Sequence, residues 1–284
     1  MNNLWSEHVQ GIMTLYLSRK LRFHDYFAEQ YHNIFKLDKN DKMKILEIGC
    51  GPGALAEALH RWYPNASITA IDRDTNFIEF AKKNVAGVEF LEGDAGALLF
   101  EDNTFDMVIS NTVQEHIEPS AFWGEQKRVL KQEGVCLCLS ARKGINCKSD
   151  CLEMTEDEKQ YWDDCPDWRE QMDRLQICKY PMTEAQIPKS MEEHGFSNVT
   201  TGYAIIDLTP DDPKYSENMA CQMIEAMRQN DLEAVGQNQI SGYEKIKDII
   251  NRKYDKRLEM YKAGYKQWDT SVSVTMIIRG NASK

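Results

Sequence analysis

The sequence predicts an α/β protein with a doubly wound, mostly parallel sheet and helical additions. Short apolar runs alternate with segments of helical periodicity across residues 44–140, as in a parallel sheet covered by helices. A strand-like run at 45–48 leads directly into three glycines at alternate positions, Gly49, Gly51 and Gly53. A strand, a glycine turn and a helix in that order bring free backbone N–H groups to the carboxyl end of the sheet, where nucleotide-like ligands bind.

Length and composition narrow the possible class of protein. The chain has 284 residues and is 42% hydrophobic, enough for a sizeable core, and its net charge is −11. That charge argues against non-specific affinity for DNA, RNA or an anionic membrane. No apolar run approaches the roughly 20 residues of a membrane span, and the first residues lack the order of a signal peptide. We therefore expect a cytoplasmic protein whose eight cysteines are free thiols.

Seven strands are expected, with helices between most of them. The glycine turn is followed by apolar residues at helical spacing that stop at Pro64, because proline cannot continue a helix interior. A later helix is expected to begin near Thr183 and to stop at Gly195. The expected strands cover residues 45–48, 68–71, 88–91, 105–109, 135–140, 199–206 and 272–278.

Three segments lie outside this alternation and suggest the domain organisation. Residues 1–40 are rich in aromatic residues and are expected to form an N-terminal helical cover. Residues 41–207 with 271–284 are expected to form the core, interrupted by a polar insertion at 144–182. Residues 208–270 carry long apolar stripes at helical spacing. We expect these to be a helical lid, with a homodimer contact as the open alternative.

Polar residues follow the ends of the predicted strands. Asp72 lies 19 residues after Gly53, where an acidic side chain binds ribose hydroxyls in doubly wound folds. Asp94 follows the third strand. Gly49, Gly51 and Ala54 also satisfy the dinucleotide fingerprint. The turn alone therefore leaves a dinucleotide and S-adenosylmethionine open as ligands.

Five motifs in this order resemble the class I S-adenosylmethionine-dependent methyltransferases, in particular the small-molecule branch that includes ubiquinone and menaquinone biosynthesis enzymes. The motifs are Glu47 to Gly53, Ile71-Asp72, Gly93-Asp94-Ala95, Phe105 to Val108 and Arg128 to Lys131. The resemblance covers about a third of the chain. It implies the Rossmann-like methyltransferase fold, S-adenosylmethionine as cofactor and methyl transfer to a small-molecule acceptor. A dinucleotide-binding enzyme would not explain the third motif, Gly93-Asp94-Ala95.

The resemblance also assigns roles to individual residues. It implies that Glu47, Gly49 and Gly51 shape the pocket for the methionine part of the cofactor, and that Asp72 holds both ribose hydroxyls. The expected cofactor-contacting residues are Glu47, Gly49, Cys50, Gly51, Gly53, Asp72, Arg73, Asp94, Ala95, Asn111 and Thr112.

Further implications concern the adenine and the last strand. Asp94 is expected to accept a hydrogen bond from the adenine amino group, with the Ala95 backbone beside it. Asn111 and Thr112 are expected to lie under the methionine part and the sulfonium. The family's last strand usually runs antiparallel between the fifth and sixth strands after a short connection. Here roughly fifty residues replace that connection, far above ordinary loop lengths.

Methyl transfer from a sulfonium is an in-line displacement, for which the protein mainly supplies orientation and a dry cleft. A base is needed only where the acceptor must lose a proton. His116 is the candidate catalytic base because it follows the fourth strand, next to the expected sulfonium site. A structural histidine at a helix start is the equally weighted alternative, and Glu115 and Tyr26 are weaker candidates.

The cysteines do not predict a metal centre. Cys147, Cys151, Cys165 and Cys178 lack the spacing of a zinc site built from two C-x-x-C pairs. Cys50 is expected to be a small filler in the turn. We therefore predict no metal ligands.

Two functional alternatives stay open at this point. One is a catalytically silent S-adenosylmethionine-binding protein whose insertion binds a partner, and the other is a protein or RNA methyltransferase. For the acceptor pocket, we predict that parts of all three additional segments close over the cofactor. The predicted lining residues are Tyr16, Tyr26, Trp162 and Tyr203.

Overall fold

The computed structural model describes residues 4–166, 168–175, 177–238 and 240–283. Its centre is a seven-stranded sheet with the order β3-β2-β1-β4-β5-β7-β6. The strands are β1 (Lys44–Ile48), β2 (Ser67–Asp72), β3 (Glu89–Glu92), β4 (Phe105–Asn111), β5 (Leu130–Cys147), β6 (Phe196–Leu208) and β7 (Thr270–Ala282). Strands β1 to β5 pair in parallel, whereas β7 is antiparallel to both β5 and β6. The predicted fold class and the reversed last strand are both confirmed.

The fifth strand is longer than the sequence indicates. β5 continues through Cys147, and its last residues pair with β7, with Ile145 opposite Val272 and Cys147 opposite Thr270. The first residues of the segment predicted as an insertion, 144–147, therefore belong to this strand. The side chains at this end of β5 are largely exposed, and a backbone ladder does not require the apolar alternation that sequence reasoning searches for.

Helices cover both faces of the sheet. One face carries α2 (Ile12–Arg22), α3 (Ala28–Phe35), α4 (Ala54–Trp62) and α5 (Thr75–Asn84), packed on Ile45, Met107 and Leu137. The other face carries α6 (Pro119–Val129) and α9 (Gln186–Glu193), packed on Leu46 and Val108. Successive residues of a buried strand point to opposite faces, which explains the continuous apolar runs. Short 3-10 helices lie at Asp25–Phe27, Gln114–His116 and Asp150–Leu152.

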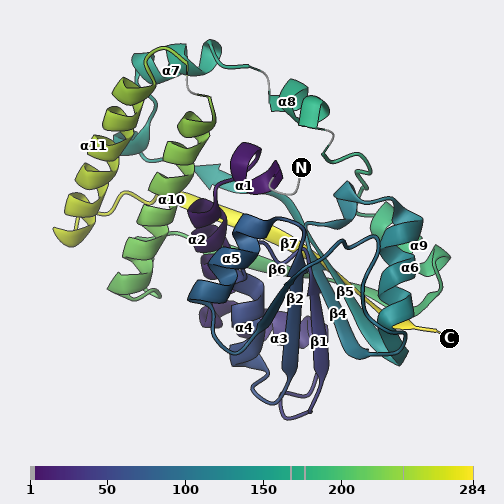
Figure 1. The fold of residues 1–284 in the computed structure, drawn as a ribbon. Coiled ribbons are helices and arrows are strands. Elements are labelled where there is room, and N and C mark those ends of the chain that lie inside the picture. The colour runs from purple at the N-terminus through teal and green to yellow at the C-terminus, as the bar shows by residue number, and fades with distance from the viewer. Residues whose placement is uncertain (1–3, 167, 176, 239, 284) are drawn as a thin grey trace.

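A second group of helices stands apart from the sheet, at the upper left of Figure 1. This group, here called the cap, comprises α7 (Glu156–Asp163), α10 (Glu217–Gln237) and α11 (Tyr243–Lys262). It has its own buried cluster, which includes Tyr161, Ile224, Ile250 and Tyr254. Helices α1 (Leu4–His8) and α2 lie between the cap and the sheet (Figure 1). α8 (Trp168–Leu175) lies beyond α7 along the chain.

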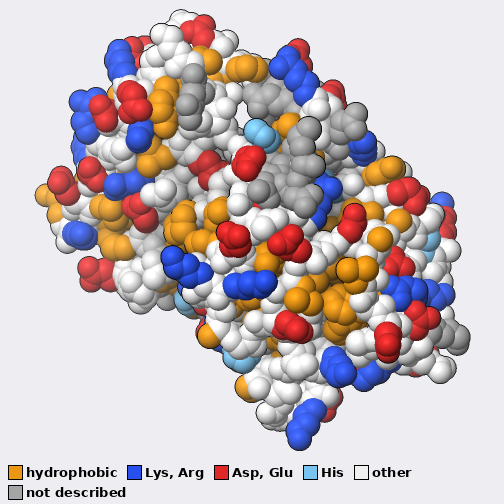
Figure 2. All heavy atoms as spheres, viewed as in Figure 1, with side chains coloured by type: hydrophobic (Ala, Val, Ile, Leu, Met, Phe, Trp, Pro, Cys, Tyr) orange, Lys and Arg blue, Asp and Glu red, His pale blue; other side chains and the backbone are white. Residues whose placement is uncertain are grey.

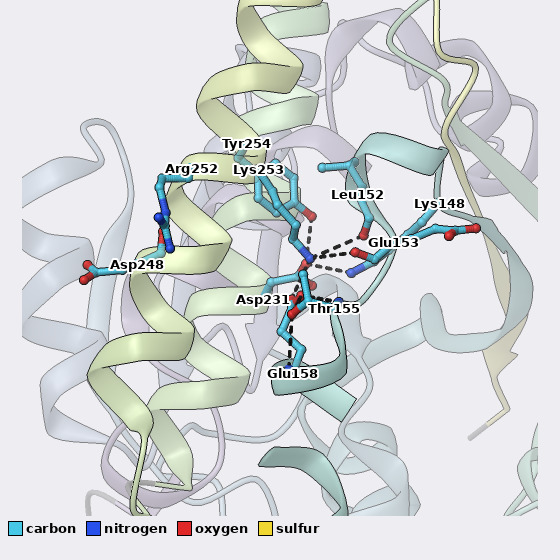
Figure 3. A network of polar contacts seen from close by, with 10 residues as sticks. All are labelled: Lys148, Leu152, Glu153, Thr155, Glu158, Asp231, Asp248, Arg252, Lys253 and Tyr254. Carbon is cyan, nitrogen blue, oxygen red and sulfur yellow. Dashed lines mark hydrogen bonds and ion pairs between the residues drawn. The ribbon is translucent and has the colours of Figure 1, made fainter. Parts of the chain in front are cut away.

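Polar contacts fasten the cap helices to the segment that follows β5. Figure 3 shows Lys253 of α11, whose Nζ lies 2.6 Å from Oε1 of the buried Glu158 of α7. In the same view, Asp231 of α10 accepts from the Tyr254 hydroxyl at 2.8 Å and pairs with Lys148 at 2.7 Å. Three helices and the segment that follows β5 are thereby joined in one network.

A buried arginine anchors the base of the cap. The Arg257 side chain is fully buried and pairs with Asp211 at 2.7 Å and with Asp269 at 2.6 Å. Asp211 also accepts backbone N–H groups of Gln267 and Trp268. The two aspartates lie before α10 and before β7, so the arginine ties together the entry to and the exit from the inserted helices.

The surface is charged but mixed. Acidic and basic side chains are interspersed over the face shown in Figure 2. No helix among the described residues combines the length and the apolar character needed to cross a membrane.

Candidate active site

A cavity opens at the carboxyl ends of β1, β2 and β4 and beside the loop after β3. Every predicted cofactor-contacting residue lines it except Gly53, and His116 lines it as well. Gly53 instead caps α4, with φ of +88°, and a Cβ there would lie 2.9 Å from the Phe90 ring. Residues that are far apart in sequence therefore converge because parallel strands end at the same edge.

The glycine turn is shaped by backbone needs. Gly49 and Gly51 have φ of +66° and +54°, a region that favours glycine. A Cβ on Gly49 would lie only 2.4 Å from Cγ2 of Val113. The Gly51 N–H donates to Oδ2 of Asp72 at 2.8 Å, so the carboxylate at the end of β2 holds the turn in place.

Two buried acceptors in the cavity have no hydrogen-bond partner among the described residues: Oε2 of Glu47 and Oδ1 of Asn111. Burial, reinforced by the nearby Asp72 charge, raises the pKa of Glu47 well above its usual value. Buried acceptors normally find a donor. These two atoms therefore fit a ligand that brings donors, such as an ammonium group.

The carboxylates of Asp72 and Asp94 occupy different environments. Asp72 accepts from Asp74 N at 2.9 Å and from Gly51 N at 2.8 Å, and burial raises its pKa despite those bonds. Asp94 is exposed at the cavity edge and accepts from Gly96 N at 2.7 Å. Each carboxylate has about four lone-pair sites, so both retain capacity for a ligand.

His116 is held in an orientation that the sequence did not reveal. Its Nδ1 accepts from the Cys178 N–H at 3.0 Å, and its ring meets the Trp5 ring edge-on at a centroid distance of 4.8 Å. Burial lowers the pKa of His116, and the negative charge of Glu115 partly offsets this shift. A neutral ring with Nδ1 engaged as acceptor carries its proton on Nε2. The geometry thus favours Nε2 as a donor and opposes the predicted role of His116 as a base.

The opposite wall of the cavity comes from the N-terminal helices. It includes Trp5 from α1 and Leu15, Arg19 and Phe23, which repeat every four residues along and just past α2. The predicted lining residues lie elsewhere: Tyr16 buried against Glu57, Tyr26 half-exposed against Tyr215, Trp162 packed in the cap, and Tyr203 half-exposed on β6. That prediction was wrong because it weighed aromatic content and ignored the four-residue spacing.

The inserted helices reach this cavity only indirectly. None of the residues that the structure describes within 148–175 and 208–270 lines it. α10 instead supports α2 from outside, where Glu233 accepts from Gly11 N at 2.5 Å and Thr14 donates to the Gln229 carbonyl at 3.4 Å. A second hollow lies between α10, α11 and the start of α2, and it shares Gln10 with the first.

Metal ligation finds no support in the residues that the structure describes. No group of three or more His, Cys, Asp or Glu side chains there is placed to hold a metal ion. Cys136 and Cys138 are buried in β5, and Cys50 is buried in the glycine turn.

Comparison with known proteins shows similarity to methyltransferases, in agreement with the residues that line the cavity. The family described as a methyltransferase domain matches residues 46–138. Residues 46–138 are therefore similar to a methyltransferase domain. Fatty-acid O-methyltransferase of Mycolicibacterium smegmatis is 34% identical over 134 residues, which are 46% of this chain and 48% of that protein. The ubiquinone/menaquinone biosynthesis C-methyltransferase UbiE of Desulfotalea psychrophila is 37% identical over 99 residues, 34% and 40% of the two chains.

The fold is also found in solved structures. Phosphoethanolamine N-methyltransferase 2 of Haemonchus contortus, solved with S-adenosyl-L-methionine, superposes with a TM-score of 0.56 at 18% identity. The match covers 99% of this chain and 59% of that one. The chain spans about half or less of the length of the curated relatives that it matches, and the family match at 46–138 lies within the core.

Proposed function

We propose that this protein transfers a methyl group from S-adenosylmethionine to a small-molecule acceptor by in-line displacement. The observation that carries the proposal is the convergence of Glu47, Asp72, Asp94 and Asn111 from successive strand ends on one cavity beside the glycine turn. The named relatives methylate fatty acids or act in quinone biosynthesis, which supports a small-molecule acceptor.

The residues present fit the cofactor. The unpartnered oxygens of Glu47 and Asn111 suit its ammonium group, and Asp72 has lone pairs left for ribose hydroxyls. Asp94 stands where the adenine amino group is expected. When bound, S-adenosylmethionine supplies an activated methyl group, so the protein needs no nucleophile of its own.

The chain's own residues then orient the reactants and keep water out. The glycine turn and the end of β4 hold one reactant, while Trp5 and Phe23 close the cavity from the other side. In this proposal His116 carries its proton on Nε2, and no base is assigned. Fixing two reactants in line supplies much of the rate enhancement in such reactions.

Calorimetry tests the cofactor assignment directly. The purified protein should bind S-adenosylmethionine or S-adenosylhomocysteine, whereas NAD should show no heat. Transfer of label from methyl-labelled S-adenosylmethionine to a panel of small acids, amines and phenols then tests turnover. Binding of NAD with neither adenosyl compound would refute the proposal. Binding without turnover of any acceptor would favour the catalytically silent protein.

We further propose that the N-terminal segment is the cover, with the insertion bracing it. Hydrogen exchange with and without S-adenosylhomocysteine separates this from a dimer arm. Slowed exchange in residues 4–23 on cofactor addition is expected. An unchanged rate there, with concentration-dependent protection of residues 217–262, would show that the insertion is a dimer contact.

A further inference from the structure

Helix α1 is too short to hold its position by itself. It has five residues, and isolated helices shorter than roughly 12–15 residues are marginal in water. Contacts with the rest of the protein must therefore fix where it lies. Glu7 and His8 of α1 are exposed, whereas Trp5 lines the cavity. The contacts that hold α1 thus also hold part of the cavity wall.

Two adjacent residues of α1 contact the ends of two different strands. The Trp5 ring meets the ring of His116, which follows β4, at a centroid distance of 4.8 Å. Ser6 contacts Asp74, which follows β2: its backbone N–H donates to Oδ2 at 2.9 Å and its hydroxyl donates to Oδ1 at 2.9 Å. In the sheet, β1 lies between β2 and β4. Helix α1 therefore bridges the ends of the two strands that flank β1 and its glycine turn (Figure 1).

Asp74 joins this contact to the expected cofactor site. The residue is fully buried, and its Oδ1 also accepts from the Asn76 N–H at 3.1 Å, which caps α5. The Asp74 N–H donates to Oδ1 of Asp72 at 2.9 Å, and Asp72 is the carboxylate expected to bind the ribose. Hydrogen bonds to an ionised acceptor are stronger than those between neutral groups. One buried carboxylate thus fastens α1 to the loop that carries Asp72.

The connection between α1 and α2 is held by a different element. The Gly11 N–H donates to Oε1 of Glu233 at 2.5 Å, and Gln237 donates to the Val9 carbonyl. Both acidic and amide side chains come from α10. The connection is therefore fixed to the cap, whereas Trp5 and Ser6 are fixed to the core. Release of the core contacts would let α1 move about residues 9–11 while α2 stays in place, since hinges lie at the ends of elements.

We propose that Ser6 and Asp74 are positioning residues that form a latch, which holds α1 over the cavity, and that the cofactor enters and leaves when this latch opens. The inference rests on the proposed function for the identity of the cofactor. A latch slows binding and release together, because both require the open form. Loss of an ordinary binding contact changes chiefly the release rate. The two rate constants therefore distinguish a latch from a contact.

Stopped-flow tryptophan fluorescence with S-adenosylhomocysteine measures both rate constants. Ser6→Ala removes the hydroxyl bond, and Asp74→Asn removes the acceptor of the Ser6 N–H while its Oδ1 can still cap α5. Each variant should raise the association and release rate constants about tenfold, because each loses one hydrogen bond to a charged group. Ser6→Thr keeps a hydroxyl and should restore the wild-type rates. Glu7→Ala is the matched control, since Glu7 is exposed on the same helix, and it should leave both rates unchanged.

Hydrogen exchange in the cofactor-free protein tests the latch independently. Exchange across residues 5–10 should be about tenfold faster in Ser6→Ala and in Asp74→Asn than in wild type, with α4 unchanged as the internal reference. Thermal unfolding verifies that each variant folds, and Ser6→Ala decides the test if Asp74→Asn does not.

Three outcomes have distinct meanings. Unchanged exchange in residues 5–10 overturns the latch. Faster release of S-adenosylhomocysteine with an unchanged association rate also overturns it, because Ser6 and Asp74 would then support only the bound state. If wild type binds neither S-adenosylmethionine nor S-adenosylhomocysteine, the proposed function fails, while exchange in the cofactor-free protein still decides whether these residues hold α1 in place.

Discussion

The core and the cap are held together in different ways. Strand residues such as Ile45, Leu46 and Ile48 are fully buried in apolar layers, and the polar groups at the strand ends face a cavity, some without partners. In the cap, buried charges such as Arg257 and Glu158 are matched by opposite charges from neighbouring elements. The difference indicates that unpartnered polar groups available to a ligand lie at the core edge, whereas the buried charges of the cap are already paired. Substitutions at the core edge should change binding, whereas substitutions in the cap should change stability.

Arg257→Met should have the largest effect. It leaves Asp211 and Asp269 buried without their counter-ion, and breaking a buried pair in this way costs about 3–5 kcal/mol of unfolding free energy. Denaturant unfolding measures the loss. Arg252→Met on the same helix is the control, since Arg252 is exposed and bonds only within its own helix, and it should stay near wild type. A loss below about 1 kcal/mol for Arg257→Met would contradict the view that paired buried charges stabilise the cap.

Asp72→Ala should act on binding. It removes the acceptor expected for ribose hydroxyls, and hydrogen bonds to a charged group contribute about 1.5–3 kcal/mol, or about ten- to a hundredfold in affinity. Calorimetry with S-adenosylhomocysteine measures the change. The exposed Asp41→Ala should bind like wild type. Unchanged affinity in Asp72→Ala would remove Asp72 from the site.

Gly49→Ala should cost about 1–2 kcal/mol of stability, because an L-residue is strained at a φ of +66° and its Cβ would meet Val113. Gly124→Ala is the matched control within α6, where nothing lies within 4 Å of the added Cβ. It should leave stability unchanged or raise it. Equal melting temperatures for the two variants would contradict the role assigned to the turn.

Sequence reasoning succeeded for the core wall of the cavity and failed for the N-terminal wall, for a physical reason. Asp72, Asp94 and Asn111 follow strand ends, and parallel topology alone brings strand ends together. Arg19 and Trp5 come from helices whose docking depends on long-range contacts with α10 and with the segment after β4. Only the four-residue repeat from Leu15 could have indicated which side of α2 faces inward.

The tautomer of His116 was equally out of reach, since Cys178 is 62 residues away and donates through its backbone. Any residue other than proline at 178 could make that bond. Side-chain identities therefore carried no signal for it. The full length of β5 was not predicted for a similar reason, because its outer end is defined by pairing with β7 rather than by its own side chains.

The smallest expected effect concerns pH and links the two walls of the cavity. Burial holds the pKa of His116 below 6.5, with Glu115 opposing and Arg73 reinforcing the shift. The neutral ring is therefore favoured in the folded state, so its contribution to stability is complete above pH 6.5 and falls as the pH drops toward the lowered folded pKa.

His116→Asn keeps an acceptor for the Cys178 N–H through its Oδ1 but cannot titrate. The unfolding free energy of wild type should therefore decline more steeply than that of His116→Asn between pH 6.5 and 5. Other histidines contribute equally to both proteins, so the difference between the two slopes isolates His116. Parallel slopes would mean that the ring is already free to take up a proton in the folded protein, and the role of general base would then regain support.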